Sequence, residues 1–214
     1  MLFIKQFLLT QLSIGVAKTF AIATLTTFTT TATINQPSYA SDINFLGIRL
    51  TDASKVATLT AKDLFNQGFD KQNKGDLQGA VAAYTEAIRL NPKYAEAYSN
   101  RGVVRARLGD NNGAIEDYNQ ALRINPNYAS AYINRGATRA RLGDNNGAIE
   151  DYNQALQINP NSASAYGNRG NARSKLGDKK GAITDLQQAA DIFKQQGQIE
   201  NYQKALEIIN QLQK

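Results

Sequence analysis

Residues 105–122 read RARLGDNNGAIEDYNQAL, and the same eighteen letters return without a change at residues 139–156. The two copies start 34 residues apart. An identity of this length does not arise by chance, so the chain contains an internal repeat. A period of about 20–50 residues is typical of solenoids, propellers and other repeat architectures, and the repeat has to be analysed before any fold is assigned.

Single residues outside the identical stretch keep the same spacing of 34. One glycine recurs in every repeat, at Gly68, Gly102, Gly136 and Gly170. Two alanines recur likewise, at Ala80, Ala114, Ala148 and Ala182 and at Ala87, Ala121, Ala155 and Ala189. An aromatic-or-leucine position and a closing proline complete the pattern, at Tyr84, Tyr118, Tyr152 and Leu186 and at Pro92, Pro126 and Pro160. The markers define units one to four, residues 61–94, 95–128, 129–162 and 163–196.

Each unit carries the pattern of two helices. In unit two, residues 114–122 place apolar side chains at the spacing of one helix face. The helix before it is expected over about residues 95–108, because Gly109 and an aspartate follow as a C-terminal signal. The second helix is expected to end before Pro126, since proline disfavours helical backbone in the residue that precedes it.

One helical hairpin cannot bury its apolar face alone, and stacked hairpins bury it continuously. Gly102 and Ala114 are small, so we expect the two helix backbones of a unit to approach closely there. After Gly197, residues 198–213 carry apolar side chains on one side and polar ones on the other. This pattern predicts that residues 197–214 form a capping helix for the stack.

The period of 34, with Gly, Ala, Tyr, Ala and Pro at these offsets, resembles the tetratricopeptide repeat. The resemblance implies an all-α, right-handed α-solenoid of four helix-turn-helix repeats. Where the family often has tryptophan, this chain has Leu64, Tyr98, Tyr132 and Tyr166. Where it often has tyrosine in the first helix, this chain has Lys71, Arg105, Arg139 and Arg173. The second departure predicts unusually charged convex and inter-helix surfaces.

Three units carry an Asn-Arg-Gly sequence in the first helix and an aspartate in the second. The arginines are Arg101, Arg135 and Arg169, and the aspartates are Asp117, Asp151 and Asp185. Unit one has Gln67 and Ala83 at these two positions, so both partners are absent together. The joint absence predicts an ion pair within each unit, and a ligand-binding role for the arginines is the alternative.

The candidate binding residues are four asparagines and three basic residues. The asparagines, Asn66, Asn100, Asn134 and Asn168, occur in all four units. In the resembled family this position faces the concave groove, where the side chain can bond the backbone of a peptide; bonding to neighbouring helices is the alternative. The basic residues, Arg107, Arg141 and Lys175, follow seven positions later on the same helix face. They predict a basic rim that favours acidic residues or a free carboxylate, with a solvated helix end as the alternative.

Some members of the resembled family bind the C-terminal carboxylates of heat-shock chaperones with a clamp of lysine and asparagine. At the positions of the first lysine and asparagine of that clamp, this chain has Phe65 and Phe69. This particular activity is therefore not expected.

The chain has no cysteine and no histidine among its 214 residues. These absences exclude disulfides, thiolate nucleophiles and cysteine-ligated metals, and they remove the side chain most used for acid–base catalysis near neutral pH. Adjacent carboxylates such as Glu116 and Asp117 recur with the scaffold in the next unit, unlike a catalytic pair. We therefore expect no enzyme activity, no cofactor, no metal and no small-molecule substrate.

Residues 1–40 contain two lysines, apolar runs and no acid, and they end in Ser38-Tyr39-Ala40. This pattern predicts a secretory signal that is cleaved after Ala40; an uncleaved membrane anchor and a disordered leader are the alternatives. Residues 41–60 are expected to form a linker. The signal predicts an exported protein. The chain resembles small exported bacterial, especially cyanobacterial, tetratricopeptide proteins, which implies the periplasm or the thylakoid lumen.

The functional hypothesis is a non-enzymatic scaffold, adaptor or assembly factor that binds a protein or an extended peptide in its concave groove. The alternative is binding of nucleic acid or another acidic ligand through the repeated arginines. Without residues 1–40, the charge balance is 22 basic against 18 acidic residues, which does not favour nucleic acid. Membrane contact is expected only if the N-terminal segment is retained as an anchor.

Overall fold

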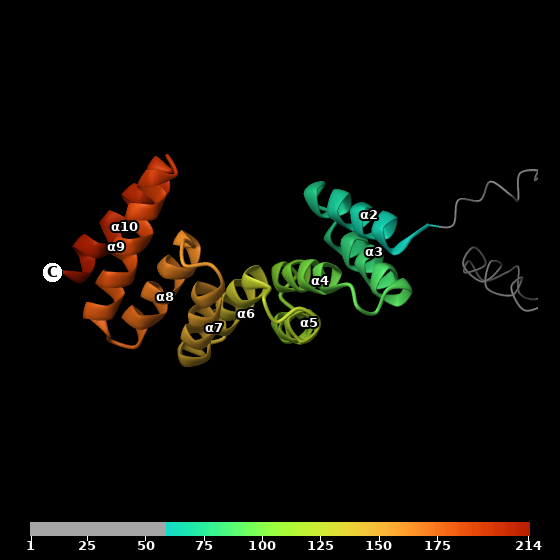
Figure 1. Ribbon diagram of the computed structural model, residues 1–214, viewed down its shortest axis with the longest axis horizontal. Helices are drawn as coiled ribbons and strands as arrows, with labels where there is room; N and C mark the ends of the chain where they lie inside the picture. The colour runs from blue at the N-terminus through green and yellow to red at the C-terminus, as the bar shows by residue number, and fades with distance from the viewer. Residues whose placement is uncertain (1–58) are drawn as a thin grey trace, which may run out of the picture. The chain divides into compact units, whose positions relative to one another are not determined.

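Figure 1 shows the computed structural model of the chain, which describes residues 59–214. The predicted signal segment and most of the predicted linker lie outside these residues. The helices of the described part are α2 (Ala61–Asn73), α3 (Leu77–Leu90), α4 (Ala95–Arg107), α5 (Asn111–Ile124), α6 (Ala129–Arg141), α7 (Asn145–Ile158), α8 (Ala163–Lys175), α9 (Lys179–Gln195) and α10 (Ile199–Leu212). The predicted all-α fold is confirmed. None of these helices is both long and apolar enough to cross a membrane.

Each unit is a hairpin of two helices, and successive hairpins pack side by side (Figure 1). The first helices of neighbouring units also touch one another, at α2–α4, α4–α6 and α6–α8. Across residues 59–214, the second helices make no comparable contact with one another. The stack therefore curves with the first helices on its inner side. We call this inner surface, formed by α2, α4, α6, α8 and then α10, the inner groove.

A three-residue turn joins the helices of each unit. In unit two, α4 is followed by Leu108 and then by Gly109, whose φ of 89° lies in the left-handed region that glycine adopts without strain. Asp110 then caps α5 by accepting a hydrogen bond of 2.9 Å from the backbone N–H of Gly113. The same cap occurs at the corresponding aspartate of every unit. The Leu-Gly-Asp sequence thus ends one helix and starts the next within three residues.

A tyrosine ring packed on a glycine sets the distance between the two helices of units one to three. In unit two, a Cβ atom on Gly102 would lie 2.7 Å from Cε1 of Tyr118 and 3.1 Å from the carbonyl oxygen of Ala114. Tyr118 and Ala114 are fully buried. The close approach predicted at Gly102 is therefore confirmed, and it involves the tyrosine ring as well as the backbone.

The stack ends in α10, which packs against α9. Ala205 and Ile209 are the buried residues of α10. Polar residues cover much of its remaining surface, among them Glu200, Gln203 and Glu207. The helix therefore presents an apolar side to the last unit and a polar side to water, as a terminal element of a solenoid requires.

We expect Gly102→Ala to lower the free energy of unfolding by about 1–3 kcal/mol, because the added methyl group overpacks the contact with Tyr118. Gly167→Ala is the matched control. Its Cβ would meet only Ala189, at 3.8 Å, so the better helix propensity of alanine should raise stability by about 0.5–1 kcal/mol. Urea unfolding followed by circular dichroism measures both changes. An equal response of the two variants would contradict the role of the glycine–tyrosine contact.

Candidate functional site

The most buried charges lie between the two helices of each of units two to four. Arg101 donates from Nε and Nη2 to the two carboxylate oxygens of Asp117, at 2.9 and 2.7 Å. Asp117 is only 2% exposed. The equivalent pairs are Arg135–Asp151 and Arg169–Asp185. The predicted ion pair within each unit is confirmed, and its two-pronged geometry fixes how the helices face one another.

A second arginine of the same helix binds the same aspartate. Nη1 of Arg139 lies 3.0 Å from Oδ2 of Asp151 and donates to the carbonyl oxygen of Gly147. Arg105 and Arg173 contact Asp117 and Asp185 in the same way. These arginines were expected to charge the convex and inter-helix surfaces. They charge the inter-helix surface as expected, and they are half-buried there because each shares the aspartate that the arginine one turn earlier also binds.

The first arginine of each pair also reaches the preceding unit. Nη1 of Arg135 donates to Oδ1 of Asn119 at 2.6 Å, and Nη1 of Arg101 donates to Oγ1 of Thr85 at 3.0 Å. The guanidinium of Arg135 also lies over the ring of Tyr132, 5.5 Å from its centroid. One side chain therefore connects three helices from two units. Arg101, Arg135 and Arg169 therefore belong to the scaffold.

The four predicted asparagines do not share one environment. Asn66 is exposed on α2, whereas the other three are half-buried. Asn168 lies between two hollows of the inner groove and lines both. The repeated asparagine is therefore best placed for a ligand in unit four.

The first hollow lies between α6 and α8 and has a volume of about 290 Å³. We call it the cationic hollow, lined by Ala137, Ala140, Arg141, Tyr152, Asn168, Asn171, Ala172 and Lys175. It brings together three of the predicted binding residues, Arg141, Asn168 and Lys175. Arg107 is exposed at the end of α4 and does not line it.

Arg141 is held in place by neutral groups. Its Nη1 donates to Oδ1 of Asn111 at 2.9 Å and to the carbonyl oxygen of Ala106 at 3.3 Å. Lys175 is exposed at the end of α8. No carboxylate of the described residues lines the cationic hollow. The positive charges of Arg141 and Lys175 are therefore not neutralised within the hollow.

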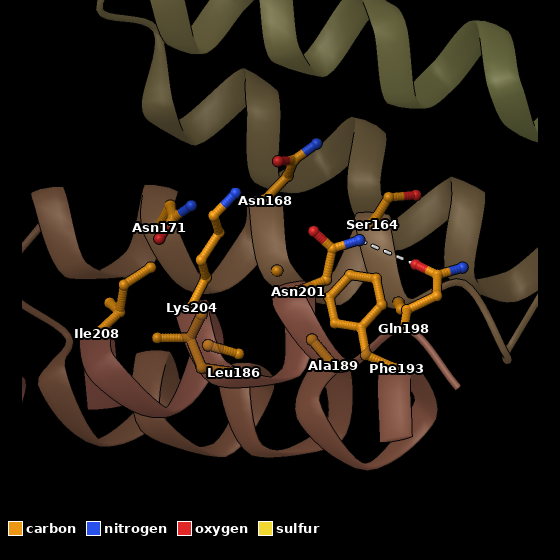
Figure 2. A pocket seen from close by; sticks show the side chains of 13 residues that line it. Ser164, Asn168, Asn171, Leu186, Ala189, Phe193, Gln198, Asn201, Lys204 and Ile208 are labelled. Atoms are coloured by element: carbon orange, nitrogen blue, oxygen red, sulfur yellow. Dashed lines mark hydrogen bonds between the residues drawn. The ribbon is translucent and has the colours of Figure 1, made fainter. Parts of the chain in front are cut away.

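The second hollow lies between α8, α9 and α10 and has a volume of about 390 Å³ (Figure 2). We call it the end hollow. Its apolar lining includes Leu186, Ala189, Phe193, Ala205 and Ile208, and its polar lining includes Ser164, Asn168, Asn171, Gln198, Asn201 and Lys204. The amide of Asn201 donates to Gln198 at 2.9 Å, and Lys204 pairs with Glu200 on the same helix at 2.7 Å. The end hollow therefore combines an apolar lining with amide groups, and its lysine has a carboxylate partner.

Two family models match the sequence. The model described as TPR repeat matches residues 73–109, 104–143 and 138–177. The model described as Tetratricopeptide repeat matches residues 163–196. The chain belongs to the tetratricopeptide repeat family. The resemblance inferred from the sequence is thus confirmed, and no curated protein matches the chain.

Solved structures share the tetratricopeptide fold. A crystal structure of MamA is 23% identical with a TM-score of 0.63, and the match covers 69% of this chain and 86% of that chain. The first TPR domain of Spaghetti (RPAP3), bound to the HSP90 peptide SRMEEVD, is 28% identical with a TM-score of 0.54, covering 55% and 94%. The Arabidopsis OM64 TPR domain is 28% identical with a TM-score of 0.53, covering 54% and 96%. At its level of identity, the likeness to MamA concerns the fold alone.

In this tetratricopeptide protein, Asn171, Tyr152 and the lining residues of α10 were not among the candidate binding residues predicted from the sequence. A signal for the first was present in the differences between units. Units two and three differ at six positions only, 96/130, 99/133, 103/137, 104/138, 123/157 and 128/162. Four of these six positions lie in the first helix, and the third of them corresponds to Asn171 in unit four. Variation among near-identical repeats therefore gathers on the helices that form the inner groove.

The described residues offer no metal site, since no three of their potential ligands come together. They include three buried tyrosines whose pKa is raised. Burial raises the pKa of Tyr84, Tyr118 and Tyr152 to about 12. The negative charge of Asp151 adds to the effect at Tyr152. These hydroxyl groups therefore remain protonated, and able to donate hydrogen bonds, at every physiological pH.

The shared aspartate predicts a measurable coupling. Arg135→Ala and Asp151→Ala should each destabilise the chain, and a double-mutant cycle should give a coupling energy of about 1–3 kcal/mol. Asp151→Ala should cost more, because it leaves both Arg135 and Arg139 without their partner. The exposed pair Arg89–Glu86 is the control and should couple by at most about 0.5 kcal/mol. Strict additivity at Arg135 and Asp151 would refute the pairing in solution.

The buried tyrosines predict alkaline destabilisation. The folded chain keeps a phenol proton that the unfolded chain loses above its ordinary pKa of 10.0. Stability should therefore be complete below pH 10 and fall as the pH rises to about 12. Urea midpoints measured across this range, with tyrosinate absorbance as a second probe, check the slope. Tyr152→Phe should make the slope shallower, and an unchanged slope would contradict the burial effect at this residue.

Proposed function

We propose that this tetratricopeptide protein is a non-enzymatic adaptor or assembly factor that binds an extended segment of a partner protein in its inner groove. The observation that supports the proposal is that one set of polar side chains stabilises the stack and a different set lines the inner groove. The repeated arginines are committed to buried aspartates within the stack. The side chains around the cationic hollow and the end hollow instead face open volume on the inner side.

The size and chemistry of the hollows fit amino-acid side chains of a peptide. Each hollow is at the lower end of, or below, the volume usual for drug-sized ligands. Asn134, Asn168 and Asn171 offer both donors and acceptors, which match the N–H and C=O groups of an extended backbone. The solved TPR domain that is bound to an HSP90 peptide supports peptide binding as a use of this fold.

The charge around the groove favours an acidic partner. Arg107, Arg141 and Lys175 stand at the C-terminal ends of α4, α6 and α8. None of the three has a carboxylate within ion-pair distance among residues 59–214. A partner with acidic side chains or a free carboxylate would be attracted to this edge of the groove. The clamp of the chaperone-binding relatives is not expected here, because Phe65 is half-buried and packs on Tyr84 and Tyr94.

Binding of nucleic acid is the second candidate, and the structure favours it less. That hypothesis relies on the repeated arginines, six of which are engaged with Asp117, Asp151 and Asp185. The basic residues that remain at the groove are too few for a continuous phosphate-binding track. A steep fall of affinity with salt would favour nucleic acid, and a gentle fall would favour a peptide groove.

We place the activity outside the cytoplasm, in the periplasm or the thylakoid lumen. Residues 1–40 support this placement through their early lysine, apolar runs, lack of acids and the small residues before Ala40. A membrane-anchored protein would result if that segment is retained.

The test is capture of partners from an extract of the exported compartment, followed by mapping of the bound segment and measurement of its Kd for the full chain. Asn134→Ala combined with Asn168→Ala should weaken binding by about fivefold or more, because two hydrogen-bonding side chains are removed from the groove. Asn112→Ala combined with Asn146→Ala is the matched control. These two asparagines are exposed at the start of α5 and α7, on the second helices. Equal binding by all variants would move the binding surface away from the inner groove.

A further inference from the structure

One buried polar atom at the interface of units three and four has no hydrogen-bond partner among residues 59–214. Oδ1 of Asn145 is buried without a hydrogen bond. Tyr152, a residue only 1% exposed, lines the cationic hollow, and its side chain makes no hydrogen bond within the described chain. Buried polar groups are nearly always paired, so each such case needs an explanation.

The interface of units two and three shows what this atom lacks. There, Oδ1 of Asn111 accepts a hydrogen bond from Arg141. One unit later, the positions of Thr138 and Arg141 are occupied by Ala172 and Lys175. The donor to the asparagine is thus replaced at this interface, while the asparagine itself, Asn145, is kept. Ala172 and Lys175 both line the cationic hollow.

The cationic hollow is lined by hydrogen-bond donors and by no acidic side chain of the described residues. Its lining includes Arg141, Lys175, Tyr152, Asn168 and Asn171, all of which carry hydrogen-bond donors. Lys175 forms no ion pair within residues 59–214, in contrast to Lys204 of the end hollow. A carboxylate satisfies cationic donors and a hydroxyl donor at once, and its charge-assisted hydrogen bonds are stronger than neutral ones.

The cationic hollow and the end hollow are neighbours on the two sides of α8. Asn168 and Asn171 line both, and they form the ridge between them. In Figure 2 the side chain of Lys204 extends from α10 toward Asn168 and Asn171, and Phe193 and Leu186 of α9 line the same hollow. A helix with its side chains is about 10 Å across, and an extended chain advances about 3.3 Å per residue. Two side chains that enter the two hollows are therefore separated by about three residues.

We infer that the partner segment carries an acidic residue and a large apolar residue about two to four positions apart, read by the cationic hollow and the end hollow respectively. This inference rests on the proposed peptide-binding function and names the chemistry of its ligand. The acidic group is held by Lys175, Arg141 and the hydroxyl of Tyr152. The apolar side chain packs on Phe193, Leu186 and Ile208. Asn168 and Asn171 bond the backbone that crosses the ridge.

The experiment uses a random peptide library displayed on phage, selected on the immobilised full chain. Sequencing should show Asp or Glu and a large apolar residue at the stated spacing. For a selected peptide, Lys175→Gln should raise the Kd by about 2–5-fold and Tyr152→Phe by about 2–10-fold. Tyr152→Phe breaks no hydrogen bond within the described chain, so the variant should fold normally and keep its urea midpoint at neutral pH.

Arg123→Gln is the control for the loss of one positive charge. Arg123 is exposed on α5, and unit three carries Gln157 at the same position, so the substitution is native to the repeat. Its Kd should stay unchanged. Replacing the acidic residue of the peptide by its amide should weaken binding to the unmodified chain and have little effect on the Lys175→Gln, Tyr152→Phe double variant.

The outcomes separate the inference from the function on which it rests. Two results would overturn the inference alone, provided that Asn134→Ala with Asn168→Ala still weakens binding. One is a set of selected peptides that lack the acidic–apolar pair, and the other is a preference for the acidic residue that persists in the Lys175→Gln, Tyr152→Phe double variant. A library that yields no binding peptide would overturn both the inference and the proposed function.

Discussion

The contact between a tyrosine ring and the bare backbone of a glycine governs the geometry of the stack. It brings the two helices of a unit so close that the carbonyl oxygen of Ala114 lies 3.1 Å from where a Cβ of Gly102 would stand. At this separation the side chains of Arg101 and Arg105 can both reach Asp117. Unit four replaces the ring by Leu186, whose Cγ would lie 3.0 Å from a Cβ of Gly170, and keeps the same arrangement.

The arginine clusters then connect one unit to the next. A buried ion pair gives little net stability by itself, because desolvation offsets the attraction. The pair instead orients the helices, because Arg135 contacts Asp151 in its own unit and Asn119 in the preceding one. The orientation of successive hairpins follows from these contacts, and the width of the inner groove follows from that orientation. The arginines that pair with buried aspartates thus set the shape of the inner groove, on which Arg141 and Lys175 lie.

The repeat made the scaffold predictable from the sequence, because the same residue types recur wherever the same contact recurs. The four helical hairpins, the close approach at Gly102 and the pairing of Arg135 with Asp151 were all predictable in this way. The role of Arg139 was not, since a long side chain can reach either solvent or the next helix and its position alone does not decide. The hollows were not predictable either. They are formed jointly by residues that differ between units, such as Ala172 and Asn171, and by α10, which lies outside the repeat.

The identical stretches 105–122 and 139–156 also bear on how such a chain can change in length. Arg101 finds an acceptor in Thr85 and Arg135 finds one in Asn119, so the joint between units tolerates different residues on its acceptor side. A duplicated unit inserted at this joint would meet surfaces that already fit it on both flanks. The scaffold can therefore gain whole units in evolution, while α10 and the hollows of units three and four stay unchanged.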